Sequence, residues 1–198
     1  MKSASSAAKP ADGVHADDRL ARDLRALRRA RGMTLAESAL RLGRSVGWLS
    51  QVERGLSAPS LGDLATIAGL FGVPLSLFFA HDVPRDEERG VVVRAGSRRS
   101  LGTSESGLVE ELLSPDLGGS FEMLRSVFAP GAELASTASR PTEEAGYVAE
   151  GVLELEIDGV WHRLAEGDSF RFAGKPFRWR NPEAEPAVVI WVVSPPVY

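Results

Sequence analysis

The sequence predicts an α+β protein of two domains, in which a bundle of helices precedes an all-β barrel or sandwich. Apolar residues recur at helical spacing in the first 80 residues, as amphipathic helices require. From about residue 108 the period changes to two, and glycine or proline turns separate short alternating segments, which is typical of a barrel or sandwich. The chain contains no cysteine, which excludes disulfides, thiol catalysis and thiolate metal sites.

Residues 32–61 have the layout of two short helices joined by a tight turn. Thr34 and Glu37 have the spacing of a capping box, and Gly43 is placed to end the first helix in a left-handed conformation. Ser45 is placed to cap the second helix. This is the layout of a DNA-reading helix-turn-helix.

Flanking helices are needed, because two helices this short cannot bury enough apolar surface alone. Ser60 after Pro59 is a suitable start for one of them. Before the motif we expect an apolar stripe formed by Leu20, Leu24 and Leu27. After it we expect a second stripe formed by Leu61, Leu64, Ile67, Ala68 and Phe71. A last short helix should then contain Leu75, Leu77, Phe78 and Phe79. The result is a bundle of about five helices over residues 19–80.

The run LRALRRARGMTLAESALRLGRSVGWLSQVERGLSAPSLGDLATIAGLFGVPLSLFF resembles the XRE family of lambda-repressor-like transcription factors. The resemblance implies a five-helix, lambda-repressor-like DNA-binding domain whose partner is double-stranded operator DNA. The features that carry it are Leu24 with Arg25, Gly43, the segment LSQVERG, Pro59 with Ser60, Leu64 with Ile67 and Ala68, and residues 77–79.

Basic charge is concentrated in the helical domain. Residues 1–80 hold 11 Lys plus Arg against 7 Asp plus Glu, whereas residues 81–198 hold 12 against 20. A polyanion attracts basic side chains regardless of base sequence, so we expect phosphate contacts from Arg41, Arg44 and Arg54. Bases should be read by the start and outward face of the second helix, which carry Ser45, Val46, Gly47, Trp48, Ser50 and Gln51.

Two features of this surface stay open. Gly47 either allows close approach of the backbone to DNA or makes room for Trp48. Five arginines of the first helix are equally compatible with phosphate contacts and with a solvated face, namely Arg22, Arg25, Arg28, Arg29 and Arg31.

Three further segments complete the organisation of the chain. Residues 1–18 lack the apolar core of a secretion signal, which predicts a disordered leader. Residues 81–106 are expected to form a linker of charged clusters around one short apolar strand at residues 91–93, before a second domain at residues 107–198. No apolar run approaches the about 20 residues of a membrane helix, so we expect a cytoplasmic protein without membrane contact.

The second domain resembles the cupin, or jelly-roll, barrel in its pattern of turns. Its two characteristic segments are PGAELASTASRPTEEAGYVAEGVLELEIDG and HRLAEGDSFRFAGKPFRWRNPE. XRE helices followed by a cupin are a known architecture of transcriptional regulators, so the two resemblances imply the same function. The residues that fit the cupin pattern are Gly131, Glu144, Gly151, Gly159, Gly167, Asp168 and Asn181.

In the family that the domain resembles, a metal-bearing cupin holds its metal with three histidines and a glutamate. This chain departs from that pattern. Thr137, Ser139 and Phe177 stand at the histidine positions, and only Glu144 remains. A catalytic transition metal needs about three protein ligands, so we expect no metal, no cofactor and no enzyme activity. The histidines are expected at the surface, and they are His15, His81 and His162.

What remains is a barrel that can bind a small-molecule effector. Strand parity places Phe170, Phe172, Phe177 and Trp179 inside, opposite Leu153, Leu155 and Ile157. The expected pocket has few polar groups, which suits ligand binding. They are Thr137, Ser139 and Glu144. Arg140 and Tyr147 are expected near the entrance, where they could hold a carboxylate or an amide. The alternative is that Phe177 plugs the barrel.

The predicted function is a sequence-specific transcriptional regulator, in which a homodimeric repressor binds pseudo-palindromic operator DNA. An effector in the metal-free cupin would change the spacing of the two DNA-binding domains through residues 81–106. Two alternatives stay open. The first is a metal-dependent cupin enzyme with an accessory DNA-binding domain, and the second is a regulator whose cupin is only a dimerisation module.

Overall fold

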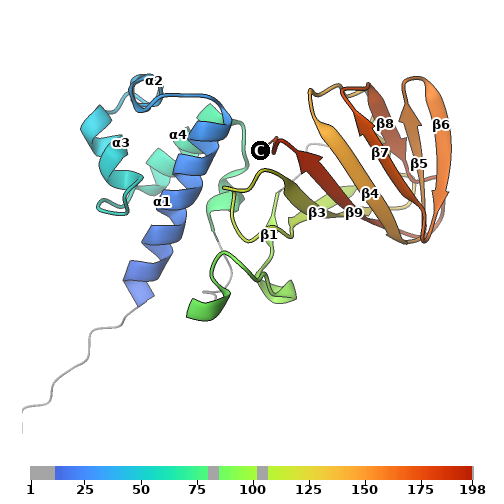
Figure 1. Ribbon diagram of the computed structural model, residues 1–198, viewed down its shortest axis with the longest axis horizontal. Helices are drawn as coiled ribbons and strands as arrows, with labels where there is room; N and C mark the ends of the chain where they lie inside the picture. The colour runs from blue at the N-terminus through green and yellow to red at the C-terminus, as the bar shows by residue number, and fades with distance from the viewer. Residues whose placement is uncertain (1–11, 80–84, 102–106, 198) are drawn as a thin grey trace, which may run out of the picture.

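The computed structural model describes residues 12–79, 85–101 and 107–197, with the backbone alone described at 12–18 and 86. Helices lie at one end of the molecule and strands at the other (Figure 1). Over the described ranges, no helix combines the length and the apolar character that a membrane span needs.

The helical domain contains four α-helices and a closing turn. Their bounds are α1 (Asp12–Ala30), α2 (Leu35–Arg41), α3 (Val46–Val52), α4 (Leu61–Phe71) and the 3₁₀ turn η1 (Leu75–Phe78). The expected fifth helix is therefore a single 3₁₀ turn, and Phe79 lies after it with 48% of its surface exposed. Helix α1 begins at Asp12, inside the expected leader.

The predicted helix ends are confirmed. Thr34 and Glu37 form the capping box of α2, and Gly43 after it has a φ of 64°. The Ser45 hydroxyl accepts a hydrogen bond from the Trp48 N–H at 3.1 Å and caps α3. Ser60 caps α4 in the same way.

The core of the bundle follows the predicted stripes with one exception. Leu24, Leu27, Ile67 and Phe71 are all buried. Leu61 is 63% exposed, so its assignment to the stripe was wrong. Side chains tilt toward the N-terminus of their helix, so a side chain in the first turn of α4 points beyond the end of the helix.

A buried ion pair connects α1 to the C-terminal end of α3. The Arg28 guanidinium donates to both carboxylate oxygens of Glu53, with Nε to Oε1 at 2.6 Å and Nη2 to Oε2 at 2.8 Å. Arg28 Nη1 also donates to the Met33 carbonyl at 2.8 Å. Bidentate bonds of this kind fix the relative orientation of their partners. Arg28 therefore holds the bundle together and is not part of a solvated face.

The linker does not contain the expected strand at residues 91–93. The N–H groups of Val91 and Val92 donate to the Glu88 carbonyl at 3.1 and 2.9 Å, and these turn bonds replace strand pairing. In the described part of the linker, residues 85–101, the structure instead has the 3₁₀ turns η2 (Asp86–Glu88) and η3 (Ala95–Ser97), followed by the short strand β1 (Arg99–Ser100).

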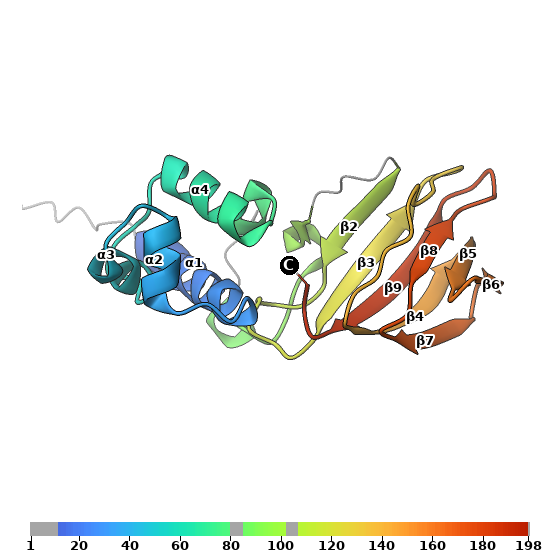
Figure 2. The same cartoon turned by 90° about the horizontal axis from the view of Figure 1, so that it is seen from above.

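The strands form two antiparallel sheets that face each other (Figures 1 and 2). The larger has the order β1-β2-β3-β9-β4-β7 and the smaller the order β6-β5-β8. The remaining bounds are β2 (Leu108–Leu112), β3 (Glu122–Phe128), β4 (Glu143–Glu150), β5 (Val152–Ile157), β6 (Val160–Ala165), β7 (Ser169–Ala173), β8 (Phe177–Arg180) and β9 (Ala187–Ser194).

Alternate residues of the strands build the barrel core, as the period of two predicts. Phe172, Phe177, Trp179, Leu153 and Leu155 are buried, whereas the expected interior residues Phe170 and Ile157 are only partly buried. The rings of Phe128 and Trp179 pack edge to face in this core, with their centres 4.7 Å apart. Strand β6 is the outer edge of the smaller sheet, and its residue His162 is exposed, as predicted.

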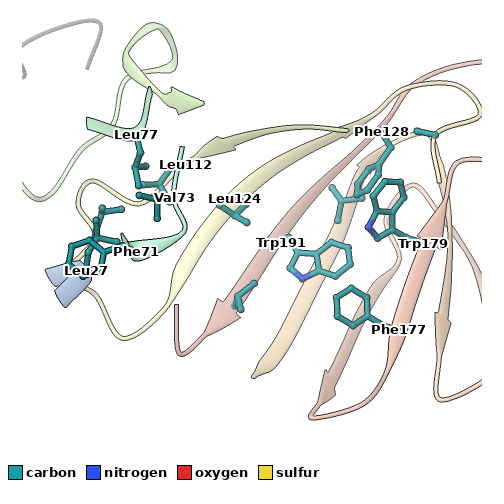
Figure 3. Close-up of a cluster of buried hydrophobic side chains, with 14 of the residues drawn as sticks. Leu27, Phe71, Val73, Leu77, Leu112, Leu124, Phe128, Phe177, Trp179 and Trp191 are labelled. Atoms are coloured by element: carbon teal, nitrogen blue, oxygen red, sulfur yellow. The ribbon is translucent and has the colours of Figure 1, made fainter. Parts of the chain in front are cut away.

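The two domains share one continuous apolar core. Figure 3 shows Phe71, Val73 and Leu77 of the helical domain beside Leu112 and Leu124 of the larger sheet. All five side chains are buried. The helical domain therefore packs on the β2–β3 end of the barrel.

A buried ion pair crosses the same junction. Arg99 of β1 lies 2.9 Å from the Asp23 carboxylate of α1, and both side chains are almost completely buried. One oxygen of Asp23 and one nitrogen of Arg99 have no hydrogen-bond partner in the described part of the chain. Burial raises the pKa of Asp23 although Arg99 opposes the shift. This pair therefore fixes how the domains meet more than it adds to stability.

We expect Arg99→Met to lower the free energy of unfolding by about 3–5 kcal/mol, because it leaves the Asp23 carboxylate buried without a partner. The double change Asp23→Leu/Arg99→Met should recover most of this loss. Arg171→Met removes an arginine from an exposed ion pair with Glu143 and should cost at most about 1 kcal/mol. Urea unfolding followed by tryptophan fluorescence measures all three. Equal losses for the two arginine variants would contradict the structural role of the junction pair.

Candidate DNA-binding and ligand-binding sites

The candidate DNA-reading surface is formed by the start and outer face of α3. Leu49 and Val52 point into the bundle and are buried, which turns the other faces of this short helix outward. The expected base-reading residues Ser45, Val46, Gly47 and Gln51 are exposed, and Ser50 is half-buried.

Trp48 differs from its neighbours in α3. It is half-buried and packs against the apolar core. The Arg44 guanidinium lies 5.3 Å from the centre of its ring and forms an ion pair with Asp63 of α4. Arg44 and Trp48 therefore support the position of α3 against α4, and the more outward residues of the helix are better placed for bases.

The expected phosphate-contacting arginines surround this helix. Arg41 in the last turn of α2 and Arg54 after α3 are exposed, as is Arg44. Arg31, which the sequence left open between two roles, donates a hydrogen bond to the Phe71 carbonyl at the end of α4. It therefore contributes to the bundle itself.

A cavity of about 390 Å³ opens where the helical domain meets the barrel. This volume lies within the range of about 300–1,000 Å³ that small-molecule sites have. Residues of both domains line it. Its principal lining residues are Val73, Pro74 and Leu77 of the helical domain, Leu101 and Leu108, and Glu110, Glu122, Arg140, Glu144, Phe177, Trp179 and Trp191 of the barrel.

Half of the expected pocket residues line this cavity, namely Arg140, Glu144, Phe177 and Trp179. Thr137, Ser139 and Tyr147 are exposed and do not line it. The Phe170 ring packs beneath Trp191, with the ring centres 4.7 Å apart, and lies against Gly146, where a Cβ atom would come within 2.3 Å of the ring. Phe177 is buried and forms one wall of this cavity.

The strand register explains why the polar lining differs from the expected one. Glu122, Leu124 and Phe128 share the inward face of β3, and Glu110 of β2 accepts a hydrogen bond from Ser126 of β3 at 3.1 Å. Glu110 and Glu122 were not among the pocket residues expected from the sequence. The available signal was Glu122, a charged residue at an inward-facing position in the alternating pattern of β3.

Burial governs the electrostatics of these carboxylates. Burial raises the pKa of Glu122 to about 7, and the charges of Glu110 and Glu144 add to the shift. Burial also raises the pKa of Glu110, against the hydrogen bond from Ser126 and the charge of Arg140. Glu144 is 1% exposed and accepts bonds from the Trp191 indole N–H at 2.9 Å and the Thr142 hydroxyl at 3.0 Å.

The residues at the metal position of the cupin fold do not fit a transition metal. Thr137 and Ser139 are exposed, and Phe177 presents a ring. Both oxygens of Glu144 accept hydrogen bonds from Thr142 and Trp191. Throughout the described ranges, no three His, Asp or Glu side chains converge as metal ligands.

Comparison with protein families assigns both domains. Residues 19–78 match a helix-turn-helix domain, and residues 124–193 match a cupin domain. A solved structure of an HTH_3 family transcriptional regulator from Vibrio cholerae is 26% identical, with 93% of this chain and 99% of that chain covered and a TM-score of 0.44.

Two relatives align with this chain over most of their length. The HTH-type transcriptional regulator SutR of Escherichia coli K12 is 32% identical over 155 residues, which cover 78% of this chain and 82% of SutR. The HTH-type transcriptional regulator PuuR of the same organism is 24% identical, with 87% and 92% covered. The helix-turn-helix, the barrel behind it and these relatives together show that the chain belongs to the XRE family of transcriptional regulators with a C-terminal cupin domain.

Proposed function

We propose that this regulator is a cytoplasmic homodimeric repressor whose metal-free cupin binds a small-molecule effector. The observation that carries the effector role is the cavity between the domains. Its walls come from the barrel and from the segment that follows α4, so a bound molecule contacts both functional parts of the chain.

The proposed mode of DNA binding places α3 in the major groove. The outward residues of α3, with Gln51 as the main hydrogen-bonding side chain, read base edges. Arg41, Arg44 and Arg54 contact phosphates on either side. Two copies of the domain bind half-sites about 34–36 Å apart, as in other dimeric helix-turn-helix proteins.

The effector acts through the contact between the domains. A ligand shifts an equilibrium only through different affinities for two states. Val73 and Leu77 form one wall of the cavity, so docked and undocked arrangements of the helical domain offer different contacts to a ligand. This coupling is more direct than the expected route through residues 81–106, parts of which lie outside the described residues.

The barrel is proposed to sense and not to catalyse. The position equivalent to a metal site holds exposed Thr137 and Ser139 and the ring of Phe177. Glu144 is buried and engaged by Trp191, which suits a structural and ligand-facing role better than proton transfer to a substrate.

Gln51→Ala should weaken specific operator binding by about 1–3 kcal/mol, because it removes a bidentate base contact. Arg41→Ala should weaken binding to all sequences and reduce the salt slope by about one. Fluorescence anisotropy with the upstream region of the gene and with a scrambled duplex, at several salt concentrations, measures both effects. Arg171→Ala, which changes an exposed arginine of β7, is the matched control. Unchanged affinity in both test variants would overturn the placement of α3.

Gly47→Ala separates the two roles left open for this glycine. There is room for a Cβ atom at this position, because its nearest contact beyond the adjacent residues and the helix backbone is Ser45 Oγ at 4.0 Å. The free protein should therefore gain up to about 1 kcal/mol of helix stability. If the backbone approaches DNA at Gly47, the same variant should lose operator affinity. Thermal unfolding and anisotropy measured on one preparation test this. A gain in stability with unchanged affinity would rule out close backbone approach.

An effector at 100 times its dissociation constant should stabilise the protein by about 2.7 kcal/mol. Thermal shift against a panel of amines, amino acids and sugar acids detects it, and the active compound should also change operator affinity. Ala138→Leu, which adds bulk to the cavity wall, should abolish the shift while operator binding of the free protein stays intact. A shift that survives in this variant would place the effector elsewhere.

A further inference from the structure

Three carboxylates face the cavity from three strands of the larger sheet. Glu110 lies on β2, Glu122 on β3 and Glu144 on β4. Glu122 and Glu144 are 2% and 1% exposed. Each of the three accepts a hydrogen bond from the protein. Buried charges are usually also paired with an opposite charge, so this lining suits a positively charged partner.

The protein itself supplies little positive charge to this group. No ion pair of Glu110, Glu122 or Glu144 with Arg or Lys is found among the described residues; the nearby pairs of Arg98 and Arg125 use Glu111, a neighbour of Glu110 on β2. Arg140 is the basic residue of the described lining, and it is exposed, with its guanidinium 5.8 Å from the centre of the Phe177 ring. Three carboxylates therefore face the cavity against one guanidinium.

The register of the sheet separates the carboxylates. Val193 of β9 pairs with Glu122 on one side and with Glu144 on the other. Two strand spacings place the Cα atoms of the two glutamates about 10 Å apart. This separation agrees with the lack of convergent metal ligands in the described chain, and it suits an elongated partner better than a compact ion.

Aromatic side chains form the rest of the wall. Phe177, Trp179 and Trp191 are buried and line the cavity, and Figure 3 shows Trp191 and Phe177 beside each other. Aromatic faces attract cations and pack against methylene groups. Carboxylates and aromatic rings therefore favour the same kind of ligand.

We propose, building on the effector role of the cavity, that the ligand is an organic cation, an elongated apolar molecule with protonated amino groups. Its ammonium groups bind between Glu110, Glu122 and Glu144. Its methylene body packs against Phe177 and Trp191.

Binding of such a cation is coupled to a proton at Glu122. The groups that face Glu122 are Glu110 of β2, Glu144 of β4, Arg140 and the backbone N–H of Val197, which donates to Oε1 at 3.2 Å. The pKa of Glu122 is about 7 in the free protein. A bound ammonium group favours the ionised form, so binding releases a proton and affinity rises with pH.

Three probes with the same methylene chain test the charge of the ligand: hexane-1,6-diamine, hexane-1,6-diol and octanedioate. Isothermal titration of the full chain at pH 8 should detect binding of the diamine alone. The affinity for the diamine should fall by up to about tenfold between pH 8 and pH 6, because one proton of Glu122 is linked to binding. Both amines of the diamine stay protonated at pH 6 and at pH 8, so titration of the probe does not contribute to this change in affinity.

Glu122→Gln keeps the size of the side chain and removes its charge. It should lower diamine affinity by about tenfold or more and abolish the pH dependence. Because burial disfavours the ionised glutamate, the variant should melt at or above the wild-type temperature at pH 8, which separates lost binding from misfolding. Glu143→Gln removes an exposed carboxylate of β4 that pairs with Arg171, and it should leave affinity unchanged.

The outcomes distinguish this inference from the effector role itself. Stronger binding of the diol or of octanedioate than of the diamine would overturn the cationic ligand and leave the cavity as an effector site. Diamine binding that Glu122→Gln does not weaken would overturn the assigned site. If no probe binds and no compound of the metabolite panel shifts the melting temperature, both the inference and the effector role fail.

Discussion

The packing of the turn after α4 against the larger sheet is the contact on which the rest of the structure depends. Val73 and Leu77 belong to the same apolar core as Leu112 and Leu124. The hydroxyl of Ser76 also donates to the Ser100 carbonyl at 3.3 Å. The DNA-binding domain thereby closes one end of the barrel and turns an open sheet surface into a cavity. Under the proposed function, the DNA-binding domain therefore also forms one wall of the ligand site.

Buried ion pairs orient the parts that this core holds together. The pair of Arg28 and Glu53 sets α1 against the end of α3, and the pair of Asp23 and Arg99 sets α1 against β1. Apolar contacts tolerate small rotations, whereas buried charged hydrogen bonds restrict them, most strongly in the bidentate pair of Arg28 and Glu53. Helix α1 therefore links the position of the recognition helix to that of the barrel.

Local signals predicted the parts of this structure that local forces decide. The caps at Thr34, Ser45 and Ser60 and the alternation of the barrel strands depend on neighbours in sequence, and the structure contains them. The cavity depends on pairing between distant strands, so Glu110 and Glu122 were not recognised as its lining. The apolar run at residues 91–93 lacked a strand partner, and turn hydrogen bonds to Glu88 formed instead. Thr137 and Ser139 were placed by a family pattern, which gives position in sequence but not the direction of a side chain.

The four tryptophans of the chain are distributed among regions with different roles. Trp48 lies in the recognition helix, Trp161 on the outer face beneath Arg178 and Arg180, and Trp179 and Trp191 in the cavity wall. The indole N–H of Trp191 donates a hydrogen bond to Glu144, so its emission should respond when a change in the cavity alters that bond. The protein thus carries separate native chromophores for its two surfaces. A variant that keeps only Trp191 would report changes at the cavity, and a variant that keeps only Trp48 would report changes at α3, each without an added label.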